Sequence, residues 1–118
     1  MNAIKIADIF PDLNFIGARE SGLEVRPKIE QALNSNDKVI LDFNKIDLVT
    51  QSFADEVIGV IIRNKGLSFV ENNIEIINAN KTIIAIINFV KKYSDKMFRK
   101  RGLMHFNIEN TKSSICSL

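Results

Sequence analysis

Cysteine and histidine are nearly absent from this chain of 118 residues, which has one of each. Because Cys116 is the only cysteine, neither an intramolecular disulfide nor a cysteine-rich zinc site can form within the chain. The single histidine, His105, argues against a metal site made by protein side chains. These shortages predict a protein of a reducing, cytoplasmic compartment that holds no metal and no cofactor.

Long apolar runs are missing as well. No stretch approaches the roughly 20 apolar residues needed to cross a bilayer, and the first ten residues lack the basic start and apolar run of a secretory signal. We therefore expect no membrane span. A hydrophobic content of 46% and a charged content of 25% are ordinary for a globular protein, and the length fits one domain.

The net charge of +2 is unevenly distributed, because the chain up to residue 64 is acidic overall and the rest is basic. A basic cluster can bind phosphates, but cations also complement the carboxyl end of a helix. Phe98 lies within the cluster, yet that side chain does not make a stacking platform. We favour a solvated helix end and do not expect nucleic-acid binding. The cluster comprises Lys91, Lys92, Lys96, Arg99, Lys100 and Arg101.

Strand-like and helix-like patterns alternate along the chain, which predicts an α/β fold with a small mixed β-sheet and helices packed against it. Strands are expected over 4–6, 15–16, 39–43 and 74–77. A first helix is expected to end near Asn34, a second to run from Ser52 to Lys65 and a third to run from Lys81 to Tyr93. Residues 67–73 are expected to form a connection. We expect a domain core over residues 1–93 and a basic extension over 94–118, with one more strand over 103–108 and a loose tail.

The start of the first helix has two interpretations. Ser21 and Glu24 have the spacing of a capping box, which favours a start at Leu23. That start leaves Pro27 inside the helix, where it removes an internal amide, whereas a start at Pro27 puts the proline at its favoured first position. Both alternatives remain open on the sequence.

The stretch from residue 38 to 66 organises the chain. An apolar strand ends in Asp42, which we interpret as a turn former. Ser52 then has the chemistry of an N-cap, since its hydroxyl can accept a bond from the amide of Asp55. Gly59 lies mid-helix, where it costs about 0.8–1 kcal/mol relative to alanine. That cost predicts that another backbone packs closely there.

The polar groups around this helix start are the candidate site. Ser52 is either a cap alone or a regulatory phosphoacceptor. Arg19 and Arg26 are either exposed or close to Asp55 and Glu56, where they would form a charge network. The loop from Gly17 to Gly22 has two glycines that allow a close approach by a ligand, although its spacing is not that of a phosphate loop.

The core VILDFNKIDLVTQSFADEVIGVI resembles the phosphoacceptor region of STAS domains, the fold of bacterial anti-sigma-factor antagonists. A closer similarity is to a STAS-like family of unknown function, with its Gly-x-Arg loop, its Ser-Gly, its helical Arg and its Ser-Phe followed by acidic residues. The chain departs from the antagonist pattern at Phe53, a bulky residue where a small one is usual. The residues that carry the resemblance are Gly17, Arg19, Ser21, Gly22, Arg26, Ser52, Phe53, Asp55, Glu56 and Gly59.

The resemblance implies a non-enzymatic interaction module in a bacterial regulatory circuit of the partner-switching kind, with Ser52 as the phosphoacceptor. It further implies a protein partner such as an anti-sigma-type or histidine-kinase-like ATPase. The alternative is a nucleotide-binding or phosphate-binding protein or enzyme, in which Arg19 and Arg26 hold phosphate while Asp55 and Glu56 hold Mg²⁺. Against an enzyme, the sequence offers no paired nucleophile and base.

Overall fold

Three parallel strands form the larger of two small sheets. The computed structural model describes the backbone of residues 2–117 and the side chains of residues 2–102. In chain order its elements are β1 (Asn2–Lys5), α1 (Ile6–Ile9), β2 (Phe15–Ile16), α2 (Arg19–Asn34), β3 (Val39–Asp42), β4 (Leu48–Val49), α3 (Gln51–Ala54), the π-helical segment η1 (Asp55–Gly59), α4 (Val60–Lys65), α5 (Leu67–Asn73), β5 (Ile74–Ile77) and α6 (Lys81–Ser117).

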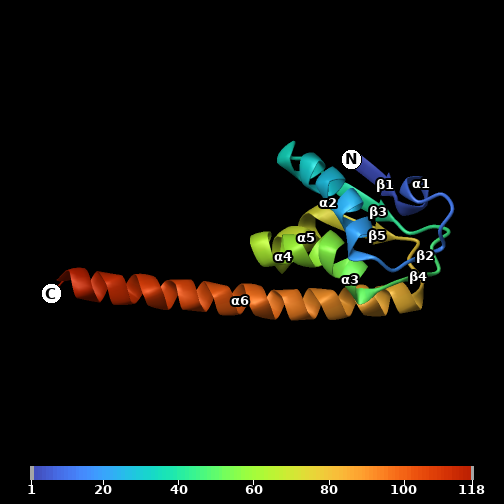
Figure 1. Ribbon diagram of the computed structural model, residues 1–118. Helices are drawn as coiled ribbons and strands as arrows, with labels where there is room; N and C mark the ends of the chain where they lie inside the picture. Colours follow the sequence, from blue (N-terminus) through green and yellow to red (C-terminus); the bar gives the residue numbers. More distant parts are fainter. Residues whose placement is uncertain (1, 118) are drawn as a thin grey trace.

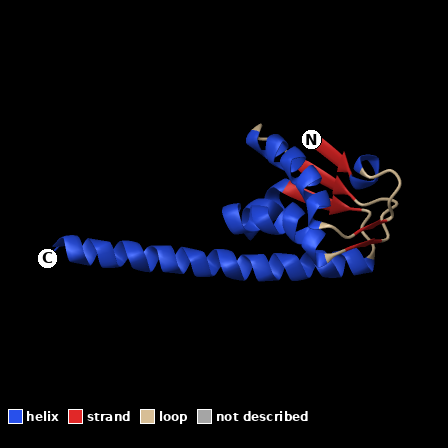
Figure 2. Cartoon of the chain, viewed as in Figure 1, coloured by secondary structure: helices blue, strands red, loops and turns tan. Residues whose placement is uncertain are grey.

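The larger sheet has the strand order β1-β3-β5, and β2 pairs with β4 in a second sheet of two strands. In the central strand, Leu41 lies level with Ile4 on one side and Ile76 on the other. Figure 2 shows the three strands side by side, with β2 and β4 near their carboxyl ends. The α/β fold class is confirmed. The expected mixed sheet is wrong in one detail, since every strand pair among the described residues is parallel.

One hydrophobic core joins the sheet to the helices. Val39 and Leu41 of β3 are buried, as the apolar run in the sequence predicts. On α2 the buried side chains Val25, Ile29 and Ala32 recur at helical spacing. The middle of the core comes from the helix that follows β4, through Phe53, Val57, Ile58, Ile61 and Ile62.

The start of α2 differs from both sequence interpretations. The helix begins at Arg19, and Ala18 occupies the N-cap position without a side-chain hydrogen bond, so Ser21 is not the cap. Pro27 lies inside the helix, on an exposed side. There water can bond the carbonyl that loses its amide partner, which makes an internal proline tolerable.

The segments α3, η1 and α4 form one continuous helical stretch with a π turn in its middle. The predicted helix end at Lys65 is confirmed, and Gly66 follows the stretch with a φ of 94°. Residues 67–73, expected to be a connection, form α5.

The last helix is longer than predicted. The helix expected over 81–93 continues as α6 to Ser117, so the expected strand over 103–108 and the loose tail up to residue 117 are wrong. Lysine, arginine and methionine, which dominate residues 96–101, are strong helix formers. Ser94 also faces the core rather than solvent. The division of the chain at residue 93 stays a prediction.

Figure 1 shows α6 running beside α3 and α4 and then projecting past the rest of the molecule. A helix of 37 residues is about 55 Å long. No helix in the described part of the chain combines the length and the apolar character that a membrane crossing requires.

Candidate functional site

The hydroxyl group that caps the helix after β4 belongs to Thr50 and not to Ser52. Thr50 Oγ1 accepts a hydrogen bond from the amide of Phe53 at 3.1 Å and donates one to the carbonyl of Gly17 at 2.7 Å. The predicted cap at Ser52 is therefore wrong. Serine is in general a somewhat better cap than threonine, so the second bond to Gly17 explains why position 50 has the role. That bond also ties the loop before α2 to the start of α3.

Ser52 is the second residue of α3 and is exposed. No hydrogen bond of the described residues uses its side chain. Its neighbour Phe53 is fully buried, with its ring edge-on to that of Phe10 at a centroid distance of 6.4 Å. The two candidates therefore differ in kind: Ser52 is accessible to another protein, whereas Phe53 belongs to the core.

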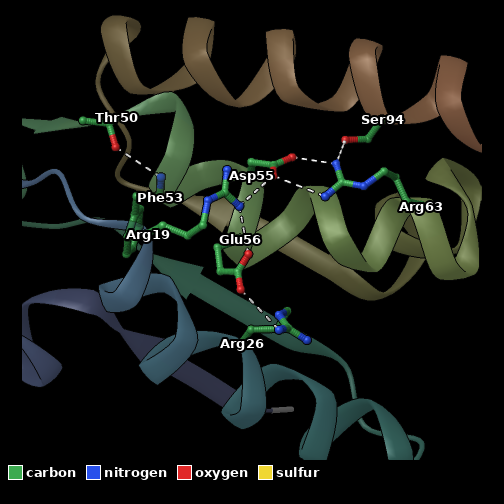
Figure 3. Close-up of polar contacts among 8 residues, drawn as sticks. All are labelled: Arg19, Arg26, Thr50, Phe53, Asp55, Glu56, Arg63 and Ser94. Carbon is green, nitrogen blue, oxygen red and sulfur yellow. Dashed lines mark hydrogen bonds and ion pairs between the residues drawn. The ribbon is translucent and has the colours of Figure 1, made fainter.

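A network of ion pairs joins α2, η1 and α4 and reaches α6 through a hydrogen bond to Ser94 (Figure 3). Arg19 Nη1 is 2.9 Å from Asp55 Oδ2 and also 2.9 Å from Glu56 Oε2. Arg26 Nη2 is 3.4 Å from Glu56 Oε1. The structure thus brings together the two arginines and the two acids that the sequence marked as a possible network. Their role in binding stays a prediction.

Arg26 has a second carboxylate partner. Its Nη1 lies 3.2 Å from Glu30 Oε1, one turn further along α2. Its Nε atom is buried without a hydrogen-bond partner. Two acids thus share one guanidinium, which fixes its position between α2 and η1.

Arg63 and Ser94 complete the network, and the sequence did not point to them. Arg63 Nη1 donates to Asp55 Oδ1 at 2.6 Å and to Ser94 Oγ at 3.1 Å. Arg63 Nη2 donates to Asp55 Oδ2 at 3.2 Å, so the contact is bidentate. The one feature of the sequence that could have drawn attention to this residue is the charge of Arg63, which directly follows the apolar residues of this helix.

The π turn explains how Arg63 reaches Asp55. In a regular α-helix eight residues make roughly 2.2 turns, so the two side chains point in different directions. A π turn holds one extra residue. The pair then takes the relation of residues seven apart in an α-helix, which share a face. The irregular segment η1 is therefore part of the site geometry.

The charges of Asp55 and Arg19 stabilise each other. Burial raises the pKa of Asp55, but the hydrogen bonds from Arg63 and then Arg19 outweigh it and hold that pKa below its usual value. The pKa of Arg19 is raised, mainly by its bond to Asp55 and next by its bond to Glu56. Asp55 is thus held as a carboxylate with two cations.

Two glycines allow the helices to approach at this network. A Cβ atom on Gly22 would lie 2.7 Å from Cβ of Glu56. A Cβ atom on Gly59 would lie 3.0 Å from both Ser94 Oγ and Val90 Cγ1, and closer still to the Asp55 carboxylate. The close packing predicted at Gly59 is present, although side chains of α6, not another backbone, make the contact.

Of the remaining candidate residues, Asp42 supports the local backbone and Ser21 lies within a helix. Asp42 is buried and accepts bonds from Asn78 Nδ2 and from the amide of Asn44, each at 2.9 Å. These bonds, the one from Asn78 first, lower its pKa. Asp42 thus holds the turn after β3, as its turn-former interpretation predicts. Ser21 lies half-buried in the first turn of α2.

Next to the network lies an open pocket of about 390 Å³. Its lining includes Arg19, Ser52 and Asp55, together with Phe89 and Tyr93 of α6. The side chain of Arg19 is 47% exposed and is the most accessible member of the network. The pocket therefore joins the exposed serine, the charged groups and two aromatic rings on one surface.

The match to known families agrees with this geometry. The chain belongs to a family described as a STAS-like domain of unknown function, whose family model matches residues 21–83. The match covers α2 from Ser21 onward, the central strand, the whole π-containing helix, α5, β5 and the start of α6, whereas Arg19 lies just before it. Neither the curated proteins nor the solved structures gave a match.

Proposed function

We propose that this chain is a non-enzymatic protein-interaction module of a bacterial, cytoplasmic regulatory circuit of the partner-switching kind, with Ser52 as its regulatory phosphoacceptor. The observation that carries the proposal is the exposure of Ser52 together with the assignment of the cap to Thr50. A structural explanation for Ser52 as a cap no longer applies. The exposed hydroxyl at the pocket rim is left for recognition by another protein.

Phosphorylation at this position would change the local charge by about −1.5 to −2. Arg19, which shares the pocket with Ser52, is a cation that such a phosphate attracts. Asp55 lines the same pocket and repels it. A phosphate on Ser52 therefore competes with Asp55 for Arg19 and alters the surface that a partner meets. The STAS-like resemblance favours an anti-sigma-type or histidine-kinase-like ATPase as that partner.

The alternative, a nucleotide-binding or phosphate-binding protein or enzyme, has weaker support. Arg19 and Arg26 already bind Asp55 and Glu56, so binding a phosphate and Mg²⁺ would break these pairs. Isothermal titration of the full chain with ATP and GTP in the presence of Mg²⁺ tests the alternative. A saturable heat signal that Arg19→Ala removes would favour it over the interaction module.

Phosphate labelling tests the proposed role of Ser52. The full chain is incubated with the protein kinases of its native cell and labelled ATP, and Ser52→Ala is expected to remove the label. Ser68→Ala is the matched control, because Ser68 is also exposed and is also the second residue of a helix, α5. Label that persists in Ser52→Ala, or that disappears equally in Ser68→Ala, contradicts the proposal.

A further inference from the structure

One face of α6 exposes large apolar side chains to solvent. Phe89, Tyr93 and Met97 are 56%, 52% and 42% exposed. Because they are four residues apart, they follow each other along one face of the helix, and we call them the apolar stripe. Isolated exposed apolar residues are common, but a contiguous group marks a binding surface. Tyrosine and other aromatic side chains are also frequent anchors of protein interfaces.

A row of lysines accompanies the apolar stripe. Lys92, Lys96 and Lys100 are exposed, and each follows one stripe residue by three positions, so the two rows are neighbours on the helix surface. Within residues 2–102, no acidic side chain pairs with any of these three lysines. Other cations of α6 do have partners: Lys91 lies 3.9 Å from Glu71, and Arg99 lies 3.1 Å from Asp95.

The stripe begins at the pocket that contains Ser52. Phe89 and Tyr93 line this pocket of about 390 Å³ together with Arg19 and Ser52. A concave pocket beside a basic, apolar ridge suits a side chain that projects from a partner. A flat lipid surface does not enter such a pocket. The combination therefore favours a folded protein element over a membrane as the occupant.

We infer that this surface binds an acidic amphipathic helix of a partner protein, with an apolar side chain in the pocket, further apolar residues on the stripe and carboxylates on the lysine row. Charge complementarity selects the acidic partner, and the four-residue spacing of both rows fits the spacing of a helix. The inference rests on the proposed function, since it names the chemistry of the partner that the Ser52 surface would bind. It also gives the regulation a direction. A phosphate on Ser52 adds negative charge at the pocket and releases an acidic helix by repulsion.

Site-specific crosslinking in the native cell tests the inference. The photoreactive residue p-benzoylphenylalanine replaces Tyr93 in the full chain, and the sequence of the crosslinked segment is read by mass spectrometry. The matched control carries the same residue in place of Leu23, which is 47% exposed on α2 and does not line the pocket. We expect the Tyr93 position, and not the Leu23 position, to capture a segment with net negative charge and apolar residues at helical spacing.

The captured segment is then synthesised and titrated against the full chain. Reversing two charges of the row, in the double variant Lys92→Glu and Lys96→Glu, is expected to weaken binding about tenfold or more. The control reverses Lys28 and Lys65, which are exposed on α2 and α4, and is expected to change binding less than about twofold. The full chain phosphorylated on Ser52 is expected to bind the segment more weakly, as the double variant Lys92→Glu and Lys96→Glu does.

Several outcomes overturn the inference. In the crosslinking experiment, these are a captured segment without net negative charge, a crosslink to lipid, nucleic acid or a second copy of the chain, and no crosslink above the Leu23 control. In the titration, equal binding by both double variants overturns it. A specific capture of a neutral or basic protein segment overturns the inference alone and leaves the interaction module standing. Label that persists in Ser52→Ala overturns the regulatory proposal instead, because the labelling experiment does not depend on the partner's charge.

Discussion

Asp55 and Arg63 are eight residues apart on one helical stretch, and their side chains meet at 2.6 Å because a π turn lies between them. Both side chains are less than one-fifth exposed. Arg63 also donates to Ser94, so the pair connects its own helix to α6. The pair thus holds the pocket wall formed by α6 in place beside the wall formed by α3.

Removing the carboxylate of Asp55 is expected to destabilise the fold. Asp55→Ala leaves the largely buried Arg63 with Ser94 as its one remaining partner among the described side chains, and it takes one of two acids from Arg19. We expect a loss of about 2 kcal/mol in the free energy of unfolding, below the cost for a fully buried pair because the site is partly exposed. Urea unfolding measures it. Asp95→Ala removes the exposed pair with Arg99 and should cost less than about 1 kcal/mol. Equal losses in both variants would contradict the role given to Asp55.

The pKa of Asp55 predicts a pH dependence. Since this pKa is lower in the folded state than its ordinary value of 3.8, the unfolded state binds more protons between the two values. The contribution of Asp55 to stability is therefore complete above about pH 5, where both states are ionised, and it is lost as the pH falls through 3.8 to the folded-state pKa. Asp42, whose pKa is also lowered, adds a contribution of the same sign.

Urea unfolding at a series of acidic pH values separates the two aspartates. Asp55→Asn should flatten the fall in stability below about pH 5 and leave the part that belongs to Asp42. Asp95→Asn, which removes a carboxylate from the exposed pair with Arg99, is the control. A wild-type curve that is flat over this range, or an unchanged curve for Asp55→Asn, would show that the network does not hold Asp55 as a carboxylate.

The sequence allowed the prediction of the elements that depend on local patterns. The apolar run of β3 and the helix end at Lys65 are in place, and the two acids of η1 do meet the arginines of α2. The cap was misassigned because residues 50 and 52 offer the same chemistry at the same spacing, and only the distant carbonyl of Gly17 distinguishes them.

Two other features depended on contacts that a single sequence does not show. Arg63 was missed because a π turn leaves no sequence signal. In a regular α-helix the side chains of residues 55 and 63 would point in different directions. The length of α6 was underestimated because Ser94 is a small polar residue, which in the sequence suggested a solvent-exposed helix end. In the structure it is fully buried and accepts its bond from Arg63, so the helix continues through it.

Gly59→Ala is expected to destabilise the protein, although alanine is the better helix former. In an open helix the change gains about 0.8–1 kcal/mol. At position 59 the new methyl group meets the Asp55 carboxylate, Ser94 and Val90, and overpacking of this kind costs about 1–3 kcal/mol. We expect a lower melting temperature. Gly102→Ala is the matched control, because Gly102 lies in α6 with nothing within 4 Å of a new Cβ atom, and it should be neutral or stabilising. Stabilisation by both changes would mean that α6 does not pack against Gly59.

Thr50 and Ser52 should differ sharply when each is changed to alanine. Thr50→Ala removes both the cap on Phe53 and the bond to Gly17, and we expect it to cost about 1–2 kcal/mol. Ser52→Ala removes an exposed hydroxyl without a described partner and should change the free energy of unfolding by less than about 0.5 kcal/mol. Thr50→Ser keeps the hydroxyl and is expected to retain most of the stability, which separates the hydrogen bonds from the packing of the methyl group. If Ser52→Ala proved as costly as Thr50→Ala, Ser52 would have a structural role after all, and its loss of phosphate labelling would have to be judged against a weakened fold.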